Sequence, residues 1–234
     1  MKKLIIAAFA LTATVSVFAQ GTVVFNNRVS GQAVNQTVHV WGPSSTSPML
    51  SLIGLGSNDS PTGTAPFAGS GMALIGAGGA AGKYGYATTF AQLIGAVGPN
   101  QPEASLMPVG QTTTFRSGTS LGDVASITST LSGTTPIPAD AAAATFEIVA
   151  WDNSTGLYST WTQASVAWLA GTIAAGKSAP FNVSNIGGSV NLTPYLTQNG
   201  QVMSSFNLYF IPEPSSFALV GLGAAAMMIF RRRK

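Results

Sequence analysis

Phe146-Glu147-Ile148-Val149-Ala150-Trp151 is the stretch that decides the fold. Successive side chains of a β-strand point to opposite faces, so the even-numbered residues here face one way and the odd-numbered residues the other. A second alternating run, Ser204–Phe210, places Phe206 and Leu208 opposite Asn207. Both runs are short and rich in β-branched and aromatic residues, which predicts strands rather than helices.

Further apolar runs of this kind recur between clusters of Gly, Ser, Thr and Asn. Strands without regularly intervening helices predict a mainly β protein, an antiparallel β-sandwich of jelly-roll or immunoglobulin-like type. Its loops should be long and rich in Gly, Ser and Pro, as in Gly42–Gly82. The expected strands are Thr22–Asn26, Val38–Trp41, Tyr84–Leu93, Thr112–Arg116, Ala144–Trp151, Ala179–Ser184, Ser189–Leu192 and Ser204–Phe210.

One short helix is predicted over Thr160–Ala170. Its apolar residues recur at a spacing that can form one face of a helix. The expected face consists of Trp161, Ala164, Val166, Trp168 and Leu169.

Both ends of the chain are apolar stretches flanked by basic residues, which predicts hydrophobic helices at the N-terminus and the C-terminus. Residues 1–19 have the pattern of a secretory signal peptide: Lys2 and Lys3, the apolar run Leu4–Phe18, and a small residue before the cut between Ala19 and Gln20. Residues 20–208 are the expected β-sandwich passenger domain, and residues 209–234 form a separate C-terminal signal. The absence of cysteine excludes disulfides and thiolate metal sites, and no cofactor or metal is expected.

The basic character of the chain belongs to its two ends. Between Gln20 and Ile211 there are four basic and six acidic residues, so this body carries a net charge of −2. Binding to nucleic-acid phosphates needs clustered Lys and Arg, so no nucleic-acid partner is expected.

Two hydrolase arrangements were considered. Gly118-Thr119-Ser120-Leu121-Gly122 has the spacing of a nucleophile elbow, but the single histidine, His39, lies upstream in a predicted strand. Glu147 and Asp152 are the best candidates for a pair of glycosidase carboxylates. Asp152 begins a sequence typical of an Asx-capped turn, and isolated turn acids are also the preferred interpretation over calcium ligands.

Four aromatic residues fall within 18 positions: Trp151, Tyr158, Trp161 and Trp168. Exposed and coplanar rings would stack on sugars, which is the basis of an alternative function as a carbohydrate-binding module or adhesin. Aromatic side chains also supply much of the buried area of a core, and this second interpretation is favoured.

The C-terminal signal has three parts, which are Pro212-Glu213-Pro214, an apolar run and the basic stop Arg231-Arg232-Arg233-Lys234. Neither proline donates an N–H, so the first part stays extended and accessible. Ser215–Phe230 spans about 24 Å at 1.5 Å per residue, short of a bilayer core of about 30 Å. This segment is therefore expected to hold the chain at the membrane only transiently. Its insertion is driven by Phe217, Leu219, Val220, Leu222, Ile229 and Phe230.

Pro212-Glu213-Pro214, the apolar run and the basic stop, in this order, resemble a PEP-CTERM sorting signal. The resemblance covers about 23 of the 234 residues. It implies export by a Gram-negative bacterium and recognition by exosortase, a membrane-embedded protease, often alongside exopolysaccharide and biofilm production. Softer similarity to passengers of this class lies in Gly21–Asn27, Thr114–Gly118 and Ala150–Asp152.

The sequence therefore predicts a non-enzymatic exported protein. Its expected route runs through signal peptidase and the inner membrane to the cell surface or extracellular matrix. An exosortase-like enzyme would process it at the inner membrane, and exopolysaccharide is a possible partner. The alternatives are the carbohydrate-binding module or adhesin and, second, a secreted hydrolase.

Overall fold

The computed structural model describes residues 20–29, 36–54, 65–196 and 203–212. Within them, the helices and strands follow in the order β1 (Thr22–Phe25), β2 (Arg28–Val29), β3 (Gln36–Thr37), β4 (Val40–Trp41), α2 (Ala65–Gly69), β5 (Thr89–Val97), η2 (Glu103–Ser105), β6 (Met107–Thr113), η3 (Gly118–Ser120), β7 (Ile127–Thr130), β8 (Ala143–Asp152), α3 (Trp161–Leu169), β9 (Ala175–Lys177), β10 (Phe181–Ser184) and β11 (Phe206–Asn207).

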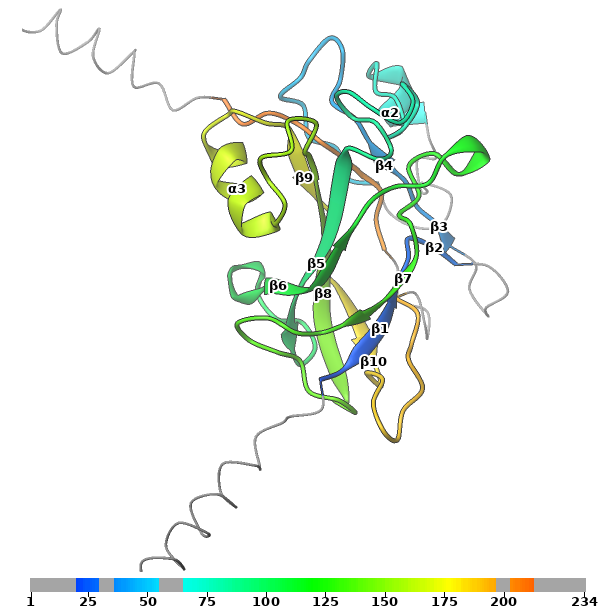
Figure 1. Ribbon diagram of the computed structural model, residues 1–234, viewed down its shortest axis with the longest axis vertical. Coiled ribbons are helices and arrows are strands. Elements are labelled where there is room, and N and C mark those ends of the chain that lie inside the picture. The colour runs from blue at the N-terminus through cyan, green and yellow to red at the C-terminus, as the bar shows by residue number, and fades with distance from the viewer. Residues whose placement is uncertain (1–19, 30–35, 55–64, 197–202, 213–234) are drawn as a thin grey trace, which may run out of the picture.

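A five-stranded antiparallel sheet forms the centre of the molecule (Figure 1). Its order is β10-β8-β5-β6, and β9 pairs with the other half of the β8 edge. β5 and β8 are the longest strands, and their register pairs Thr89 with Asp152 and Val97 with Ala144. Three two-stranded pairs complete the β structure: β1 with β7, β2 with β3, and β4 with β11. Of these, only the pair of β4 and β11 is parallel.

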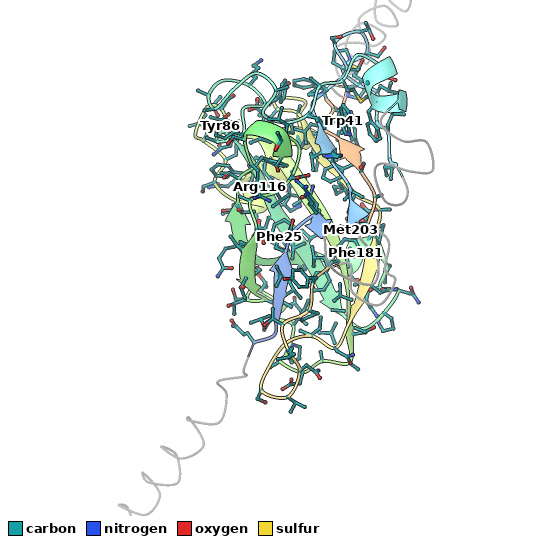
Figure 2. The ribbon with its side chains drawn as sticks, turned by 90° about the vertical axis from the view of Figure 1, so that its right-hand side faces the viewer. Phe25, Trp41, Tyr86, Arg116, Phe181 and Met203 are labelled. Carbon is teal, nitrogen blue, oxygen red and sulfur yellow. The ribbon has the colours of Figure 1, made fainter. Side chains whose placement is uncertain are left out.

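The alternation predicted for Phe146–Trp151 is confirmed. The even-numbered residues lie in the larger core, together with Val23 and Phe25 of β1 and Phe181 of β10. Figure 2 shows Phe25, Phe181 and Met203 in the middle of the molecule, at this core. On the opposite face, Val149 and Trp151 lie in a second core that is closed by α3. The central strand is therefore buried on both sides.

Most predicted strands are found, with shifted ends. The strand expected at Tyr84–Leu93 begins at Thr89 and runs on to Val97, and the one expected at Thr112–Arg116 ends at Thr113. The mainly antiparallel β class is confirmed. The finer jelly-roll or immunoglobulin-like topology stays a prediction.

The strand predicted at Ser189–Leu192 is wrong. Val190 and Leu192 are 83% and 92% exposed, so their alternation buries nothing. Instead, the carboxylate of Asp140 accepts hydrogen bonds from the backbone N–H groups of Ser189, Val190 and Asn191, at 2.7–3.0 Å. These bonds, that from Asn191 first, lower the pKa of Asp140. A side chain that satisfies three successive N–H groups replaces the partner strand that the sequence pattern suggested.

The predicted helix is confirmed as α3, and its start is fixed by a capping box. The Gln163 N–H donates to Thr160 Oγ1, and the Gln163 side chain accepts from the Thr160 N–H. The predicted apolar face is wrong at two positions, since Val166 and Leu169 are 68% and 61% exposed. Ala167 is buried instead, so the apolar face that α3 packs against the sheet is a stripe of residues three or four apart: Trp161, Ala164, Ala167 and Trp168.

The two ends of the described chain lie far apart along the long axis. In Figure 1 the first residues, in blue, enter at the lower end of β1, and the last residues, in orange, leave near α3 at the upper end. Gln20 is the first described residue and is exposed, whereas Ala19 and the rest of the expected signal peptide lie outside the described residues. Among the residues described, no helix is both long and apolar enough to cross a bilayer.

Candidate functional site

The segment Phe206–Phe210 is the part of the body that leads into the C-terminal signal. Phe206 and Leu208 are fully buried in the main core. Leu208 N donates to Trp41 O at 2.8 Å, which continues the parallel pairing of β11 with β4. The alternation predicted for this segment therefore exists, although only Phe206–Asn207 is regular strand.

Two further sets of contacts hold the same segment on the other side. Tyr209 and Ala175 exchange backbone hydrogen bonds of 2.9 and 3.2 Å, and the Trp168 indole N–H donates to Tyr209 O at 2.9 Å. Gly176 allows the close approach, because a Cβ there would run into the Asn207 carbonyl. The segment is thus an extra edge of the sheet beside β9.

These contacts end abruptly. Phe210 N donates to Pro48 O at 2.9 Å, Ile211 is half-buried, and Pro212 is exposed. The folded body therefore reaches Phe210, two residues beyond the expected boundary at residue 208. Glu213 and Pro214, the six apolar residues expected to enter the membrane and Arg231–Lys234 lie outside the described residues.

The comparison with known families concerns this same point of the chain. Residues 210–234 match the family model of the PEP-CTERM protein-sorting motif. The tail is a PEP-CTERM sorting motif. The resemblance seen in the sequence is thereby confirmed, and the match begins at Phe210, the last residue described up to Pro212 that donates a backbone hydrogen bond to the body. No curated protein and no solved structure matched the chain.

The PEP-CTERM motif marks an exported protein that is sorted through the membrane and processed by an exosortase-type enzyme. The match says nothing of residues 20–209, so the chemistry of the passenger has to be argued from its own side chains.

The four aromatic residues proposed to stack on sugars form part of the second core. Trp151, Trp161 and Trp168 are 0%, 8% and 5% exposed, and Tyr158 is half-buried. Neighbouring ring centroids lie 5.8 Å apart, at interplanar angles near 50°. The favoured interpretation, that these side chains fill a core, is confirmed because α3 packs them against the sheet, and the exposed, coplanar rings that sugar stacking requires are not found among these four residues.

Glu147 is the one charged residue in the buried central part of β8, and it is 1% exposed. It lines a cavity of about 460 Å³ at the end of the second core. Its Oε2 has no hydrogen-bond partner among the residues that the structure describes. Burial, and next the negative charge of Glu103, raise the pKa of Glu147 to about 7, against the opposing effect of Lys177.

The mouth of this cavity carries an ion pair. Lys177 Nζ, at the end of β9, donates to Glu103 Oε1 of η2. Sequence analysis missed both residues, because each is a single charge in an otherwise neutral segment. The sequence did contain one indication of this site, which is Glu147, a carboxylate inside an apolar strand. A buried charge needs a compensating neighbour, so a cation such as Lys177 could have been expected close to it.

The proposed pair of Glu147 and Asp152 does not share this cavity. Asp152 is absent from the cavity lining, and its Oδ1 accepts from Ser154 N at 3.0 Å. Asn153 continues the same turn by accepting from Tyr158 N at 2.8 Å. The predicted Asx turn is confirmed.

Ser120 and His39 belong to a cluster around the buried carboxylate of Asp123. Arg28 Nη1 donates to Ser120 Oγ at 3.0 Å and lies 3.5 Å from Asp123 Oδ2. His39 Nε2 lies 3.5 Å from Asp123 Oδ1. Burial raises the pKa of Asp123, and His39, Arg28 and Arg116 counteract this in that order.

This cluster lacks the hydrogen-bonding order of a serine hydrolase. In a catalytic triad, His Nε2 faces the serine and Nδ1 the carboxylate, whereas here Nε2 faces Asp123. Ser120 accepts from a guanidinium and ends the three-residue helix η3, not a strand-to-helix elbow. Among the described residues, no group of three or more His, Cys, Asp or Glu side chains could hold a metal ion.

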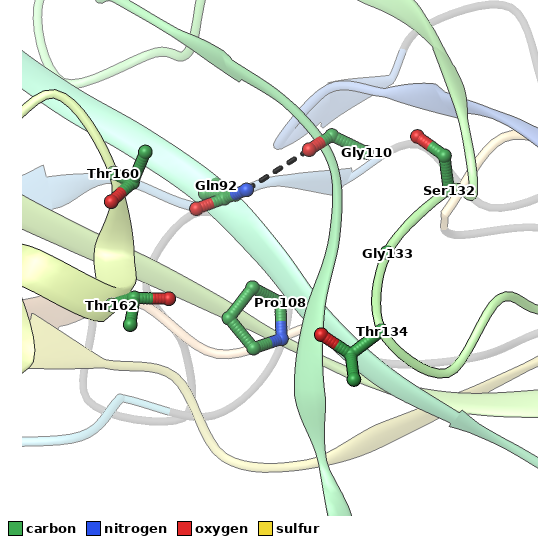
Figure 3. Close-up of a pocket in the computed structure, with 8 residues that line it drawn as sticks. All are labelled: Gln92, Pro108, Gly110, Ser132, Gly133, Thr134, Thr160 and Thr162. Atoms are coloured by element: carbon green, nitrogen blue, oxygen red, sulfur yellow. Dashed lines mark hydrogen bonds between the residues drawn. The ribbon is translucent and has the colours of Figure 1, made fainter.

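A second hollow, of about 350 Å³, lies between β6, the start of α3 and the loop after β7 (Figure 3). Gln92 crosses its floor: its Nε2 donates to Gly110 O at 2.9 Å, and its Oε1 accepts from Trp161 N at 3.2 Å. Hydroxyl groups of Ser132, Thr134, Thr160 and Thr162 line the rim. Because both ends of the Gln92 amide are satisfied, this side chain fixes α3 to the sheet.

Proposed function

We propose that this protein is a non-enzymatic passenger of a Gram-negative bacterium that its PEP-CTERM motif delivers to the cell surface or extracellular matrix. One observation carries the proposal. The sorting motif begins at Phe210, which is the last residue of the described segment 203–212 with a backbone hydrogen bond to the folded body.

The junction suits a processing enzyme that must act beside a folded domain. Residues up to Phe210 are held by backbone bonds on two sides, whereas Pro212 is exposed. Proline has no backbone N–H and disfavours the helical conformation in the residue before it, so a Pro-Glu-Pro sequence favours an extended chain. A processing enzyme can therefore bind the motif as an extended chain without unfolding the body.

The non-enzymatic role is supported by how the candidate catalytic groups are used. Ser120 is engaged by Arg28, Asp152 holds a turn, and the aromatic rings lie in a core. The partners proposed are signal peptidase, an exosortase-like enzyme, the membrane during sorting, and exopolysaccharide at the destination.

The experiment compares the wild type with Pro212→Ala/Glu213→Ala/Pro214→Ala in the native host. The wild type should yield a mature form without Arg231–Lys234, and the triple variant a membrane-retained precursor. Intact mass and cell fractionation measure both. A matched control, Thr134→Ala/Thr135→Ala/Pro136→Ala, changes three exposed loop residues and should be processed as the wild type is. A mature wild-type protein that retains Arg231–Lys234 would contradict the proposal.

A further inference from the structure

We propose that the cavity between Glu103, Glu147 and Lys177 binds a neutral, hydroxyl-rich ligand of the size of a hexose unit. This proposal concerns the folded body alone and is independent of how the sorting motif is processed. It also differs from sugar stacking on Trp151 and Trp161, which the second core excludes.

The first argument is the unsatisfied oxygen of Glu147. A buried polar atom without a hydrogen bond is costly, and such atoms in folded proteins usually indicate a missing partner. Glu147 Oε2 is such an atom among the residues described, and its side chain lines an open cavity. A ligand hydroxyl would supply the missing bond once the carboxyl group turns Oε2, which is itself buried, toward the cavity. Near neutral pH the carboxyl can both donate and accept, because its pKa is raised to about 7.

The second argument is the mixture of donors and acceptors. Lys177 offers only donors, whereas Glu103 offers only acceptors when ionised. Lys177 and Glu103 neutralise each other, and Glu147 is partly protonated near neutral pH, so the site has little net charge with which to attract an anionic or a cationic ligand. A polyol suits both partners, since each hydroxyl donates one hydrogen bond and accepts others.

The third argument is the shape of the cavity. Its volume of about 460 Å³ lies within the range of small-molecule sites, about 300–1,000 Å³. Apolar side chains complete the lining, which matches the C–H faces of a sugar ring: Ile53, Trp168, Leu169, Tyr209 and Ile211. Polar groups that fix orientation within mainly apolar walls are typical of such sites.

The hollow in Figure 3 is a weaker candidate for the same ligand. Its buried polar side chain, Gln92, already has partners at both ends of its amide. It therefore serves as an internal control, since it also offers hydroxyl groups and a comparable volume.

The test is ligand binding to the full chain, purified in a detergent without a sugar head group and followed by saturation-transfer NMR. The probes are glucose, galactose and mannose, each compared with its 2-amino derivative and its uronic acid. At least one neutral hexose should bind about tenfold more tightly than both of its charged counterparts. Failure of all three to bind at tens of millimolar, or tighter binding of a charged counterpart, would overturn the proposal.

Variants locate the site. Glu147→Leu and Lys177→Met should each weaken binding about tenfold, as expected for a lost hydrogen bond to a charged or buried group. Glu147→Gln keeps the shape and a hydrogen-bonding end, and should stay within about threefold of the wild type. Should Glu147→Leu fail to fold, Lys177→Met carries the test, because Lys177 lies at the partly exposed mouth.

Thr134→Val is the matched control in the second hollow and should leave hexose binding unchanged. Equal binding by the wild type, Glu147→Leu and Lys177→Met would place the ligand elsewhere and overturn the proposal. Loss of binding in Thr134→Val alone would do the same.

Discussion

Asn27 joins three segments of the chain through one buried side chain. Its Nδ2 donates to Val38 O at 2.8 Å and to Gly122 O at 3.0 Å, and its Oδ1 accepts from Val124 N at 2.7 Å. Asn27, Val38, Gly122 and Val124 are all buried, so the polar groups that form these three bonds need partners within the protein. The side chain therefore adds to the direct backbone hydrogen bonds from Val38 N to Asn27 O and from Val40 N to Gly122 O, which join the same segments.

Asn27→Ala should lower the free energy of unfolding by about 2–4 kcal/mol, because it removes the side-chain partner of two buried backbone groups, Val38 O and Val124 N, whereas Gly122 O keeps its bond from Val40 N. Urea unfolding measures the loss. Asn26→Ala is the matched control: the Asn26 side chain accepts one exposed hydrogen bond from Arg28 N, so its loss should cost under about 1 kcal/mol. Equal effects of the two variants would contradict this role for Asn27.

Glu147 makes stability depend on pH. Its pKa is raised from 4.5 to about 7, chiefly by burial and next by Glu103, with Lys177 opposing. Between these values the folded state holds the proton more tightly than the unfolded state. The free energy of unfolding should therefore fall as pH rises from about 4.5 to 7 and change little above that.

Glu147→Gln should remove this fall. At pH 8 the variant should be about 1–3 kcal/mol more stable than the wild type, since one pKa unit corresponds to about 1.4 kcal/mol and the cavity admits some solvent. At pH 4.5 the two should nearly coincide. Urea unfolding across this range measures both curves, and a wild-type curve that rises between pH 5 and 7 would contradict the prediction.

At the scale of elements, α3 shows how a local signal sets a boundary. Thr160 and Gln163 close the first turn on each other, and Gln92 accepts from Trp161 N. The first backbone N–H groups of a helix lack partners within the helix and are costly when buried, so these three side chains determine where α3 can begin.

Thr160→Ala should destabilise the protein by about 1 kcal/mol through loss of the capping hydroxyl. Thr162→Ala, two residues further along the chain, is the control. Thr162 is exposed and alanine favours the helix, so this substitution should be neutral or slightly stabilising. Thermal unfolding compares them, and a Thr162→Ala loss as large as that of Thr160→Ala would refute the capping role.

The sequence predicted elements well where burial enforces a period, and poorly where contacts are distant. Phe146–Trp151 alternates because both faces of β8 are buried. Polar and apolar residues also alternate in Ser189–Leu192, yet no strand forms there. Its backbone N–H groups donate to Asp140, which is far away in sequence. The Glu147 cavity likewise depends on Glu103 and Lys177, which only the folded chain brings together. By contrast, the sorting motif could be read directly, since its three parts are contiguous.

At the scale of the whole molecule, the last folded segment belongs to the core rather than to the tail. Phe206 and Leu208 are at most 1% exposed, although they lie within six residues of the sorting motif's Pro212. Their burial means that the body is complete only once the chain has continued to Phe210.

A chain ending after Ile211 should therefore unfold cooperatively, with a midpoint near that of the full chain. A chain ending after Ser205 should lose at least about 3 kcal/mol, because two fully buried side chains contribute about 1.5–3 kcal/mol each. Circular dichroism during urea unfolding distinguishes them. Similar stability of both truncations would contradict the docking of Phe206–Phe210.

The placement of the described ends at opposite poles of the long axis has a mechanical consequence. When the tail is anchored and the opposite end of the body is pulled, the force acts along the long axis of the molecule. The tail-side load reaches the core through β11 and β4, which run parallel, so their hydrogen bonds are sheared together rather than opened one at a time. The junction should therefore resist tension until several of these hydrogen bonds break together.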